Sequence, residues 1–266
     1  MLYIVATPIG TLSEVTYRAI EILKGVDYIA CEDTRTSKVF LNHYEIDKPL
    51  VSYHKYNELF SLDKIVADLK NGKNIALISD AGMPGISDPG NVLVNKLIEC
   101  GLPYTVVSGP SACINAFVLS GFETPFTFVG FLPDKNGDKV KALQEYKTYK
   151  STLIFYVSPH DLVETLSTMH NVLGNRKICV VRELTKKFEE VYFTTLADGY
   201  GSVLKGEFVV VVQGYMEENN DLLSKSVVEH VKYYIDNGFS KNEAIKLVAK
   251  ERKQKKDEIY KQVLDL

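Results

Sequence analysis

A short apolar run that stops abruptly in a loop rich in glycine and proline constrains the fold more than any other stretch. Ile75–Ile78 has the length and aliphatic content of a buried strand. The loop after it, Ser79–Gly90, holds Asp80 and Asp88 among three glycines and two prolines. Ligands of open α/β sheets bind beyond the carboxyl ends of strands. The loop therefore predicts a binding site rather than an ordinary turn with solvated aspartates.

The start of the chain predicts a second loop of this kind. Leu2–Ala6 is expected to be a strand, and the turn Thr7–Thr11 leads to a helix over residues 16–24 with Thr16 as its N-cap. The dinucleotide fingerprint G-x-G-x-x-G is absent, and Pro8 occupies the turn where its glycines would lie. A nucleotide-type ligand must therefore be held in another way.

Two more expected strands end in polar turns. Val26–Cys31 leads into Glu32, Asp33, Thr34 and Arg35, which either cap a helix over residues 37–42 or belong to a site. Tyr104–Val107 leads into a turn with Gly109 and Ser111, and then a helix over residues 113–119. Free amides at that helix start, together with the Ser111 hydroxyl, are suited to an anion or a carboxylate.

The segment Ser52–Glu58, which precedes an expected helix over residues 62–70, mixes aromatic and cationic side chains. Tyr53, His54 and Tyr56 fit two descriptions equally: a base-stacking surface, or a surface loop with a partly packed tyrosine. His54 alone can act as a base or join a hydrogen-bond network.

The pattern changes around Gly121–Pro125, where we place a domain boundary. Leu132–Lys139 is expected to be a long exposed loop of mixed charge, with a helix over residues 140–149 after it. The expected strands of this second part are Phe126–Phe131, Thr152–Val157, Ile178–Val181, Glu189–Thr195 and a central strand within Gly206–Gly214, which is apolar on both faces.

The end of the strand Ile178–Val181 carries a cluster of charges. Arg182, Glu183 and Lys186 form either a solvated ion-pair network or part of a site, and their position at a carboxyl end keeps both possibilities open.

A basic helical tail follows the polar linker Glu217–Asp221. Helices are expected over residues 227–236, 240–250 and 257–264, with a stop at Asn237-Gly238 and a capping box between Ser240 and Glu243. The basic residues suit either a phosphate backbone or a solvated helix face. They are Lys241, Lys246, Lys250, Arg252, Lys253, Lys255, Lys256 and Lys261.

Composition excludes several classes of protein. With 266 residues, 45% hydrophobic and 24% charged, the chain is long enough for two globular domains. No apolar run approaches the roughly 20 residues of a membrane span, and no basic leader precedes the first strand, so a cytoplasmic address is expected. Four scattered cysteines and five histidines without H-x-x-x-H spacing indicate neither a disulfide framework nor a metal site.

These motifs together make the chain resemble the tetrapyrrole methylase superfamily, and within it the ribosomal RNA small subunit methyltransferase I family. The resemblance spans Leu2 to about Gly214 and continues into the tail. Val157 stands where an acid is usual in that family, and Ser108 where a proline is usual. The motifs are Ala6–Gly10, Ala30–Arg35, Ser52–His54, Ile78–Gly90, Gly109–Ala112, Gly130–Pro133, Phe155–His160, Arg182–Lys186 and Phe188–Glu190.

The resemblance implies an α/β fold: two α/β domains of the tetrapyrrole methylase type (1–120 and 121–215) with a cofactor cleft between them, and a small C-terminal helical domain (222–266). It implies S-adenosylmethionine as cofactor, commonly a homodimer, and methylation of a cytidine ribose 2′-hydroxyl in small-subunit ribosomal RNA or an assembled small ribosomal subunit. The cofactor-lining residues carried over are Pro8, Ile9, Asp80, Ala81, Gly82, Met83, Ser111, Ala112, Tyr156 and Phe208.

Methyl transfer to a sugar hydroxyl needs removal of its proton, by a general base or with help from a cation. The candidates are Glu32, Asp33, His54, Glu183 and Lys186, among which we favour Asp33 with Lys186. For RNA binding we expect the tail lysines, Lys135, Lys139 and Arg35 on phosphate, and Tyr53, Tyr56 or Phe131 on a base. Two alternatives remain open, a tetrapyrrole methyltransferase and a non-catalytic RNA-binding ribosome-assembly factor with this fold.

Overall fold

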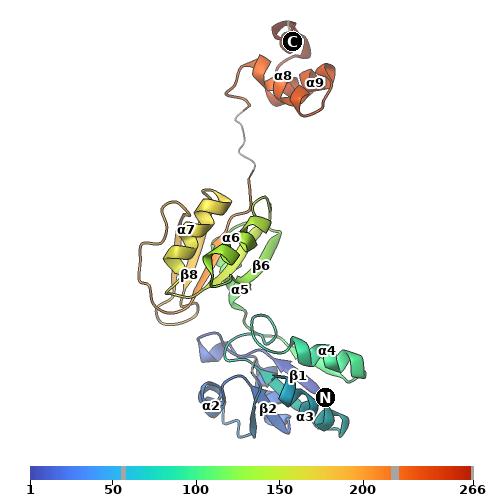
Figure 1. The fold of residues 1–266 in the computed structure, drawn as a ribbon, viewed down its shortest axis with the longest axis vertical. Coiled ribbons are helices and arrows are strands. Elements are labelled where there is room, and N and C mark those ends of the chain that lie inside the picture. The colour runs from blue at the N-terminus through green and yellow to red at the C-terminus, as the bar shows by residue number, and fades with distance from the viewer. Residues whose placement is uncertain (55–57, 217–221, 265–266) are drawn as a thin grey trace. The chain divides into compact units, whose positions relative to one another are not determined.

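The computed structural model describes residues 1–54, 58–216 and 222–264. The chain divides into two compact units, Met1–Tyr215 and Met216–Leu266 (Figure 1). The first unit contains two five-stranded sheets, and the second is helical.

The first sheet is entirely parallel, in the order β3-β2-β4-β1-β5. A parallel sheet needs crossover helices that cover both its faces, and its strands are therefore apolar on both sides. Its strands are β1 (Leu2–Val5), β2 (Tyr28–Cys31), β3 (Leu50–Ser52), β4 (Ile75–Ile78) and β5 (Tyr104–Val107).

Alternate residues of these strands build two cores, because successive side chains point to opposite faces of a sheet. On one face Leu2 and Leu77 pack with α3 (Glu58–Lys70) and α4 (Asn91–Cys100). On the other, Val5 packs with α1 (Tyr17–Gly25) and α2 (Thr34–His43). A short 3-10 helix, η1 (Leu12–Glu14), precedes α1.

The second sheet is mixed, in the order β6-β7-β10-β8-β9. β6 and β7 are parallel, and the other three neighbouring pairs are antiparallel. β10 is therefore central and runs against β7 and β8. The strands are β6 (Phe126–Phe131), β7 (Thr152–Val157), β8 (Lys177–Arg182), β9 (Glu190–Thr195) and β10 (Phe208–Val212).

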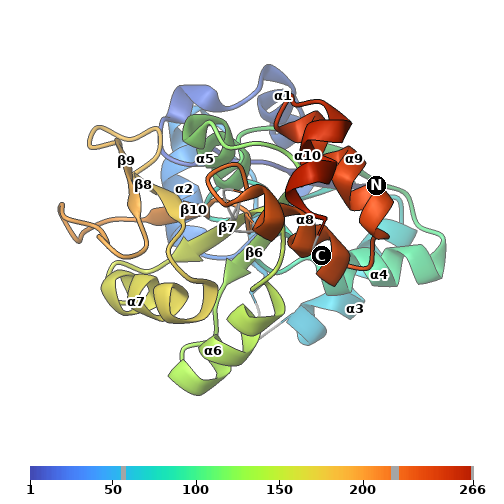
Figure 2. The ribbon, with the colours of Figure 1, turned by 90° about the horizontal axis from the view of Figure 1, so that it is seen from above.

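Helices cover both faces of this sheet too. Figure 2 shows α6 (Asn136–Glu145) and α7 (Leu162–Leu173) on one side of β7 and β10, and α5 (Ala112–Ser120) on the other. Phe155 and Val210 pack in the core beneath α6 and α7, whereas Ile154 and Val211 pack in the core shared with α5.

The helical unit consists of α8 (Val227–Asp236), α9 (Lys241–Glu251) and α10 (Lys256–Gln262) around a small core. Ser226 with Glu229, and Ser240 with Glu243, form capping boxes at the starts of α8 and α9. Buried His230 joins these helices: one ring nitrogen contacts Glu251 at 2.9 Å, and Arg252 Nε donates to the other at 3.1 Å.

The sequence predicted most of these elements. Ile75–Ile78, Tyr104–Val107, Phe126–Phe131 and Val227–Asp236 have the expected bounds, and Thr16 caps α1 by accepting the Ala19 N–H at 3.1 Å. We also confirm the capping box at Ser240.

Three expectations about the chain were incomplete or wrong. The sequence did not predict β3 or α7, because β3 is only three residues long and Asp161, the N-cap residue of α7, comes almost directly after the proline-containing turn that follows β7. The exposed loop expected up to Lys139 ends earlier, since α6 begins at Asn136 and Lys139 is buried.

Among the described residues, no helix combines the length and the apolar character that crossing a membrane requires.

Candidate active site

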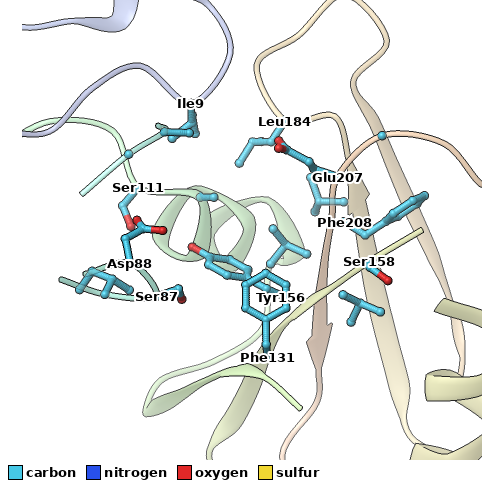
Figure 3. Close-up of a pocket in the computed structure, with 18 of the residues that line it drawn as sticks. Ile9, Ser87, Asp88, Ser111, Phe131, Tyr156, Ser158, Leu184, Glu207 and Phe208 are labelled. Atoms are coloured by element: carbon cyan, nitrogen blue, oxygen red, sulfur yellow. The ribbon is translucent and has the colours of Figure 1, made fainter. Parts of the chain in front are cut away.

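Within the first unit, loops of the first sheet and strands of the second enclose a cavity of about 360 Å³ (Figure 3). Ile9, Asp88 and Ser111 lie on one side of it, and Leu184 and Phe208 lie on the other, as Figure 3 shows. The complete lining is Ile9, Ala81–Met83, Ile86–Asp88, Ser111, Ala112, Phe131, Tyr156–Pro159, Val181, Leu184 and Gly206–Val209.

Backbone hydrogen bonds hold two of the lining loops together. Thr7 N–H donates to Gly82 O at 2.9 Å, and Gly82 N–H donates to Thr7 O at 3.1 Å. The Thr7 hydroxyl also donates to Ser79 O at 3.2 Å. The turn after β1 and the loop after β4 therefore form one rigid part of the wall.

Gly82 is required by this arrangement. Its φ of +77° lies in the left-handed region, and a Cβ there would meet Ile9 Cγ2 at 3.2 Å. Glycine at this position lets the apolar Ile9 side chain and the loop backbone share one surface of the cavity.

The N-terminus of α5 contributes a polar receptor. Ser111 is the N-cap residue, but its side chain makes no capping hydrogen bond and instead contacts Cys113 Sγ at 3.2 Å. The first amides of a helix have no partner within the helix, and the helix dipole favours negative charge there. A carboxylate bound in the cavity can accept those amides.

The second sheet supplies an apolar wall. Val181 and Val209 come from neighbouring strands, with Leu184 and Phe208 beside them. Tyr156 and Phe131 extend this wall, with ring centroids 5.5 Å apart at 64°. Such a wall suits the flat face of a heterocycle.

Carboxylates gather where β2 and β4 end. Burial raises the pKa of Asp88, an effect that a Ser79 hydrogen bond partly opposes and the charge of Asp80 reinforces. Burial, Asp88 and Asp80 likewise raise the pKa of Glu32, while His54 lowers it. Asp88 is the member of this group that lines the cavity.

Asp33 lies in a different electrostatic environment. It caps α2, and its carboxylate accepts Arg35 Nη2 at 2.7 Å and Arg35 N at 2.8 Å. These hydrogen bonds lower the pKa of Asp33 to about 2. Asp33 N–H also donates to Asp80 Oδ1 at 3.1 Å. Asp33 therefore caps α2, one of the two roles that the sequence left open, and it also lies next to Asp80 of the other loop.

Lys186 lies between two carboxylates at the end of β8. Its ammonium is 3.0 Å from Glu183 Oε1 and 2.8 Å from Glu207 Oε2. Burial alone would lower the pKa of Lys186, but these two hydrogen bonds outweigh it and raise that pKa. Burial also opposes the lowered pKa of Glu183, which Lys186 and the Glu207 N–H produce.

The same turn carries backbone strain. Glu183 has φ +49° and Thr185 has φ +64°, although neither is glycine. Thr11 N–H donates to Thr185 Oγ1 at 3.0 Å, and the Thr11 hydroxyl donates to Thr185 O. A strained turn of the second sheet is therefore joined to the first loop of the chain.

Most of the cofactor-lining residues proposed from sequence face this cavity. Those in its wall are Ile9, Ala81, Gly82, Met83, Ser111, Ala112, Tyr156 and Phe208. Pro8 is buried in the turn, and Asp80 accepts the Asp33 N–H; neither residue lines the cavity.

The five catalytic candidates do not form one group and do not line the cavity. Asp33 pairs with Arg35 near Asp80, Lys186 pairs with Glu183, and Glu32 interacts electrostatically with His54.

Sequence reasoning missed Glu207 and Ser158 as lining residues. Glu207 precedes its strand, so the rule that sites follow carboxyl ends did not reveal it.

Tyr53 is buried in the first core with 1% exposure, so the prediction that it stacks on RNA is wrong. Tyr56 lies outside the described residues. Lys139 is buried and cannot meet phosphate on the surface.

Across the described ranges, no group of three or more histidine, cysteine, aspartate or glutamate side chains is arranged to hold a metal ion.

The sequence profile of the family described as Tetrapyrrole (Corrin/Porphyrin) Methylases matches residues 1–199. A ribosomal RNA small subunit methyltransferase I from Halalkalibacterium halodurans is 46% identical, with 97% of this chain and 93% of the relative covered. The protein of that name from Bacillus subtilis is 45% identical, with 98% and 92% covered.

Solved structures share the fold at low identity. Diphthine synthase has a TM-score of 0.64 at 12% identity, covering 81% of this chain and 90% of that one. The uroporphyrin-III-C-methyltransferase of Thermus thermophilus has a TM-score of 0.57 at 17% identity, covering 80% and 93%.

Proposed function

We propose that this chain, which belongs to the tetrapyrrole methylase family and within it to the ribosomal RNA small subunit methyltransferase I family, methylates the ribose 2′-hydroxyl of a cytidine in small-subunit ribosomal RNA. The observation that carries the proposal is a single cavity that joins an apolar wall, a helix N-terminus and the half-buried Asp88 carboxylate.

The cavity fits S-adenosylmethionine by size and by chemistry. Its volume of about 360 Å³ lies within the usual range for small-molecule sites, about 300–1,000 Å³. The α5 amides beside Ser111 would hold the amino-acid carboxylate, and Leu184, Tyr156 and Phe208 would hold the adenine. The cofactor, when bound, supplies an electrophilic methyl group on a sulfonium.

The protein's own contribution is to hold the sugar oxygen in line with that methyl group and to remove its proton. Positioning of two reactants accounts for much of the acceleration in such reactions. Asp88 is the best-placed base, because it lines the cavity and burial raises its pKa above that of an ordinary aspartate. The lowered pKa values of Asp33 and Glu183 make those two carboxylates weaker bases.

Lys186 would then act through charge. Its ammonium is held protonated beside Glu207, which lines the cavity. A fixed cation near the reacting oxygen stabilises the negative charge that develops as the proton leaves.

RNA would be held by basic residues outside the cavity. Within the described tail, Lys246, Lys250, Lys253, Lys255, Lys256 and Lys261 are exposed. Arg252 instead donates to Leu222 O and Lys225 O, so it stabilises the helical unit. Phe131, 62% exposed at the cavity mouth, is available to stack on a base.

A homodimer in the cytoplasm completes the proposal. The edge strand β5 exposes Tyr104 and Val106, and α5 exposes Ile114, Val118 and Leu119. Large apolar side chains on neighbouring elements favour a protein partner.

Mass mapping of ribose methylation in ribosomal RNA, from cells with and without this protein, tests the function directly. We expect one cytidine methyl group to disappear and to return when purified protein and S-adenosylmethionine are added to the unmodified small subunit. Addition to free RNA distinguishes the two possible substrates. Unchanged methylation in the deleted strain contradicts the proposal.

The same preparation separates the two alternatives. A tetrapyrrole methyltransferase would consume the cofactor with a tetrapyrrole and without RNA. A non-catalytic assembly factor need not bind S-adenosylmethionine, and calorimetry measures that binding.

A further inference from the structure

A second, smaller cavity of about 190 Å³ adjoins the first. The two share Phe131, Tyr156, Val157 and Ser158 as lining residues. The remainder of its wall comes from the loop after β6 and from the starts of α6 and α7. Those residues are Leu132, Pro133, Asp134, Lys139, Asp161 and Thr165.

Lys139 is the unusual member of this wall, because it is a charged side chain with only 3% exposure. Its ammonium donates to Thr165 Oγ1 at 3.3 Å, while the carboxylate of Glu164 lies 3.8 Å away, beyond hydrogen-bond distance. An ammonium carries three N–H donors, and burying a charge without partners is unfavourable. These two contacts leave Lys139 able to donate into the cavity.

Carboxylates limit what that donor can bind. Asp134 and Asp161 line the same small space, and Asp161 accepts the Ser158 hydroxyl. Two acids beside one ammonium repel an anion such as a phosphate group. The set of one ammonium, two hydroxyls and two carboxylates suits a neutral ligand that has both acceptors and donors.

The boundary between the cavities favours a flat ligand. Phe131 is exposed, and its ring lies against Tyr156 (Figure 3). Exposed aromatic rings at the mouth of a polar pocket are how proteins bind unstacked bases. Because the two cavities share four lining residues, a base there would adjoin the first cavity, in which the proposed methyl transfer takes place.

We propose that this second cavity holds the base of the methylated nucleotide and selects cytosine, with Lys139 and Thr165 donating to its N3 and O2 and Asp161 accepting from its N4 amino group. The inference rests on the proposed function, since it names the base whose ribose occupies the first cavity. A carboxylate has lone pairs for the amino group in addition to the Ser158 hydroxyl.

The same arrangement rejects uracil. Uracil presents an oxygen where cytosine presents its amino group, and that oxygen would face the Asp161 carboxylate. A site built around a hydrogen bond discriminates strongly against an analogue that leaves its polar groups unpaired.

The first experiment compares Lys139→Met with Lys141→Met, a control on the same helix whose side chain is 80% exposed. With unmethylated small subunits as substrate, we expect Lys139→Met to raise KM for the subunit about tenfold or more, and the control to change it less than twofold. Calorimetry should show unchanged affinity of both variants for S-adenosylmethionine. Weaker cofactor binding in Lys139→Met assigns the cavity to the cofactor and overturns the inference.

Phe131→Ala is a second test that does not risk unfolding the protein, because removal of an exposed ring leaves the core intact. It should weaken subunit binding several-fold. Unchanged KM in both Phe131→Ala and Lys139→Met also overturns the inference.

Asp161→Asn addresses selectivity. Subunits carrying uridine at the target position should be poor substrates for the natural protein, and Asp161→Asn should reduce its preference for cytidine at least tenfold. Asp138→Asn, on the exposed start of α6, should keep the preference. An unchanged preference in Asp161→Asn contradicts the assignment.

A binding measurement separates this inference from the proposed function. Cytidine and uridine are titrated into protein saturated with S-adenosylhomocysteine, with saturation-transfer NMR as the readout. Preferential binding of cytidine that Lys139→Met abolishes supports the cavity assignment even if no ribosomal RNA is methylated. Equal binding of both nucleosides contradicts it even if methylation occurs.

Discussion

The two sheets of the first unit build the same cavity by different means. Every residue that the first sheet's half contributes lies after a strand, in a loop or at a helix start, from Ile9 to Ala112. The second sheet's half contributes loop residues such as Leu184 and Glu207, but it also contributes residues from within its strands, including Tyr156, Val181 and Val209.

Strand direction explains this difference. The first sheet is parallel, so the carboxyl ends of its strands meet at one edge and their loops converge there. In the second sheet β10 runs against its neighbours, and Phe208 pairs with Val157 on one side and Arg182 on the other. The amino end of β10 therefore reaches the same edge as the carboxyl ends of β7 and β8. The parallel sheet therefore contributes its polar and reactive side chains through loops, whereas the mixed sheet contributes an apolar wall.

The largest expected effect tests whether chemistry resides on the first sheet's side. Asp88→Asn should lower kcat about 100-fold or more, because a general base contributes 10²–10⁴-fold and the amide cannot take a proton. Affinity for S-adenosylmethionine should change little. The measurement is single-turnover methyl transfer to unmethylated subunits.

A pH profile sharpens the same prediction. Because Asp88 must be deprotonated to act and its pKa is raised, activity of the natural protein should fall as pH decreases through a value above the usual range for aspartate. The Asp138→Asn control should show the natural rate and profile. A rate in Asp88→Asn within threefold of that control would remove Asp88 from the chemistry.

The second prediction tests the wall. Leu184→Ala should weaken S-adenosylmethionine binding about tenfold, since burying a leucine side chain is worth about 1.5–3 kcal/mol and part of that is lost. The rate at saturating cofactor should remain nearly unchanged. Calorimetry gives the affinity, with the half-exposed Leu204→Ala as control. A fall in kcat without a change in affinity would place chemistry on the second sheet as well.

The same contrast explains how far the sequence could be interpreted. Loops after parallel strands can be recognised in the sequence by glycine, proline and acidic residues next to short apolar runs. The loops at Asp80–Met83 and Ser111 were predicted in this way. Glu207 and Gly206 precede β10, and nothing local in the sequence shows that this strand runs in reverse. Pairing direction depends on contacts distant in sequence.

The burial of individual polar residues could not be predicted from the sequence either. Lys139 follows a run that looks like an exposed loop, and its burial depends on α7, whose Thr165 lies 26 positions later. Tyr53 shares its polar neighbourhood with His54, but it packs with Ile65 in the first core. Side chains with both polar and apolar parts cannot be assigned to surface or core from composition alone.

The third prediction extends the comparison to the helical unit, which we expect to contribute positive charge for RNA binding rather than residues that line the cavity. Lys246, Lys250, Lys253 and Lys256 changed together to Gln should weaken subunit binding several-fold and lower the slope of log K against log salt by about 3, at roughly 0.7–0.9 per phosphate contact. The control changes Lys24, Lys70, Lys147 and Lys177 to Gln, with the same loss of charge. Equal slopes in the two variants would assign the salt dependence to overall charge.

The smallest effect tests whether the two sheets act as one body. Thr185→Val removes the hydroxyl that accepts the Thr11 N–H but keeps the side-chain shape, so the backbone strain at φ +64° is unchanged. Loss of this hydrogen bond should lower the free energy of unfolding by about 1 kcal/mol. Thr194→Val on β9, where the hydroxyl makes no such link among the described contacts, should be neutral or slightly stabilising. Urea denaturation followed by circular dichroism measures both. If Thr185→Val is no less stable than Thr194→Val, apolar packing around Ile9 and Leu184 holds the loop and the wall together instead. The strained turn at Thr185 would then serve to position Lys186.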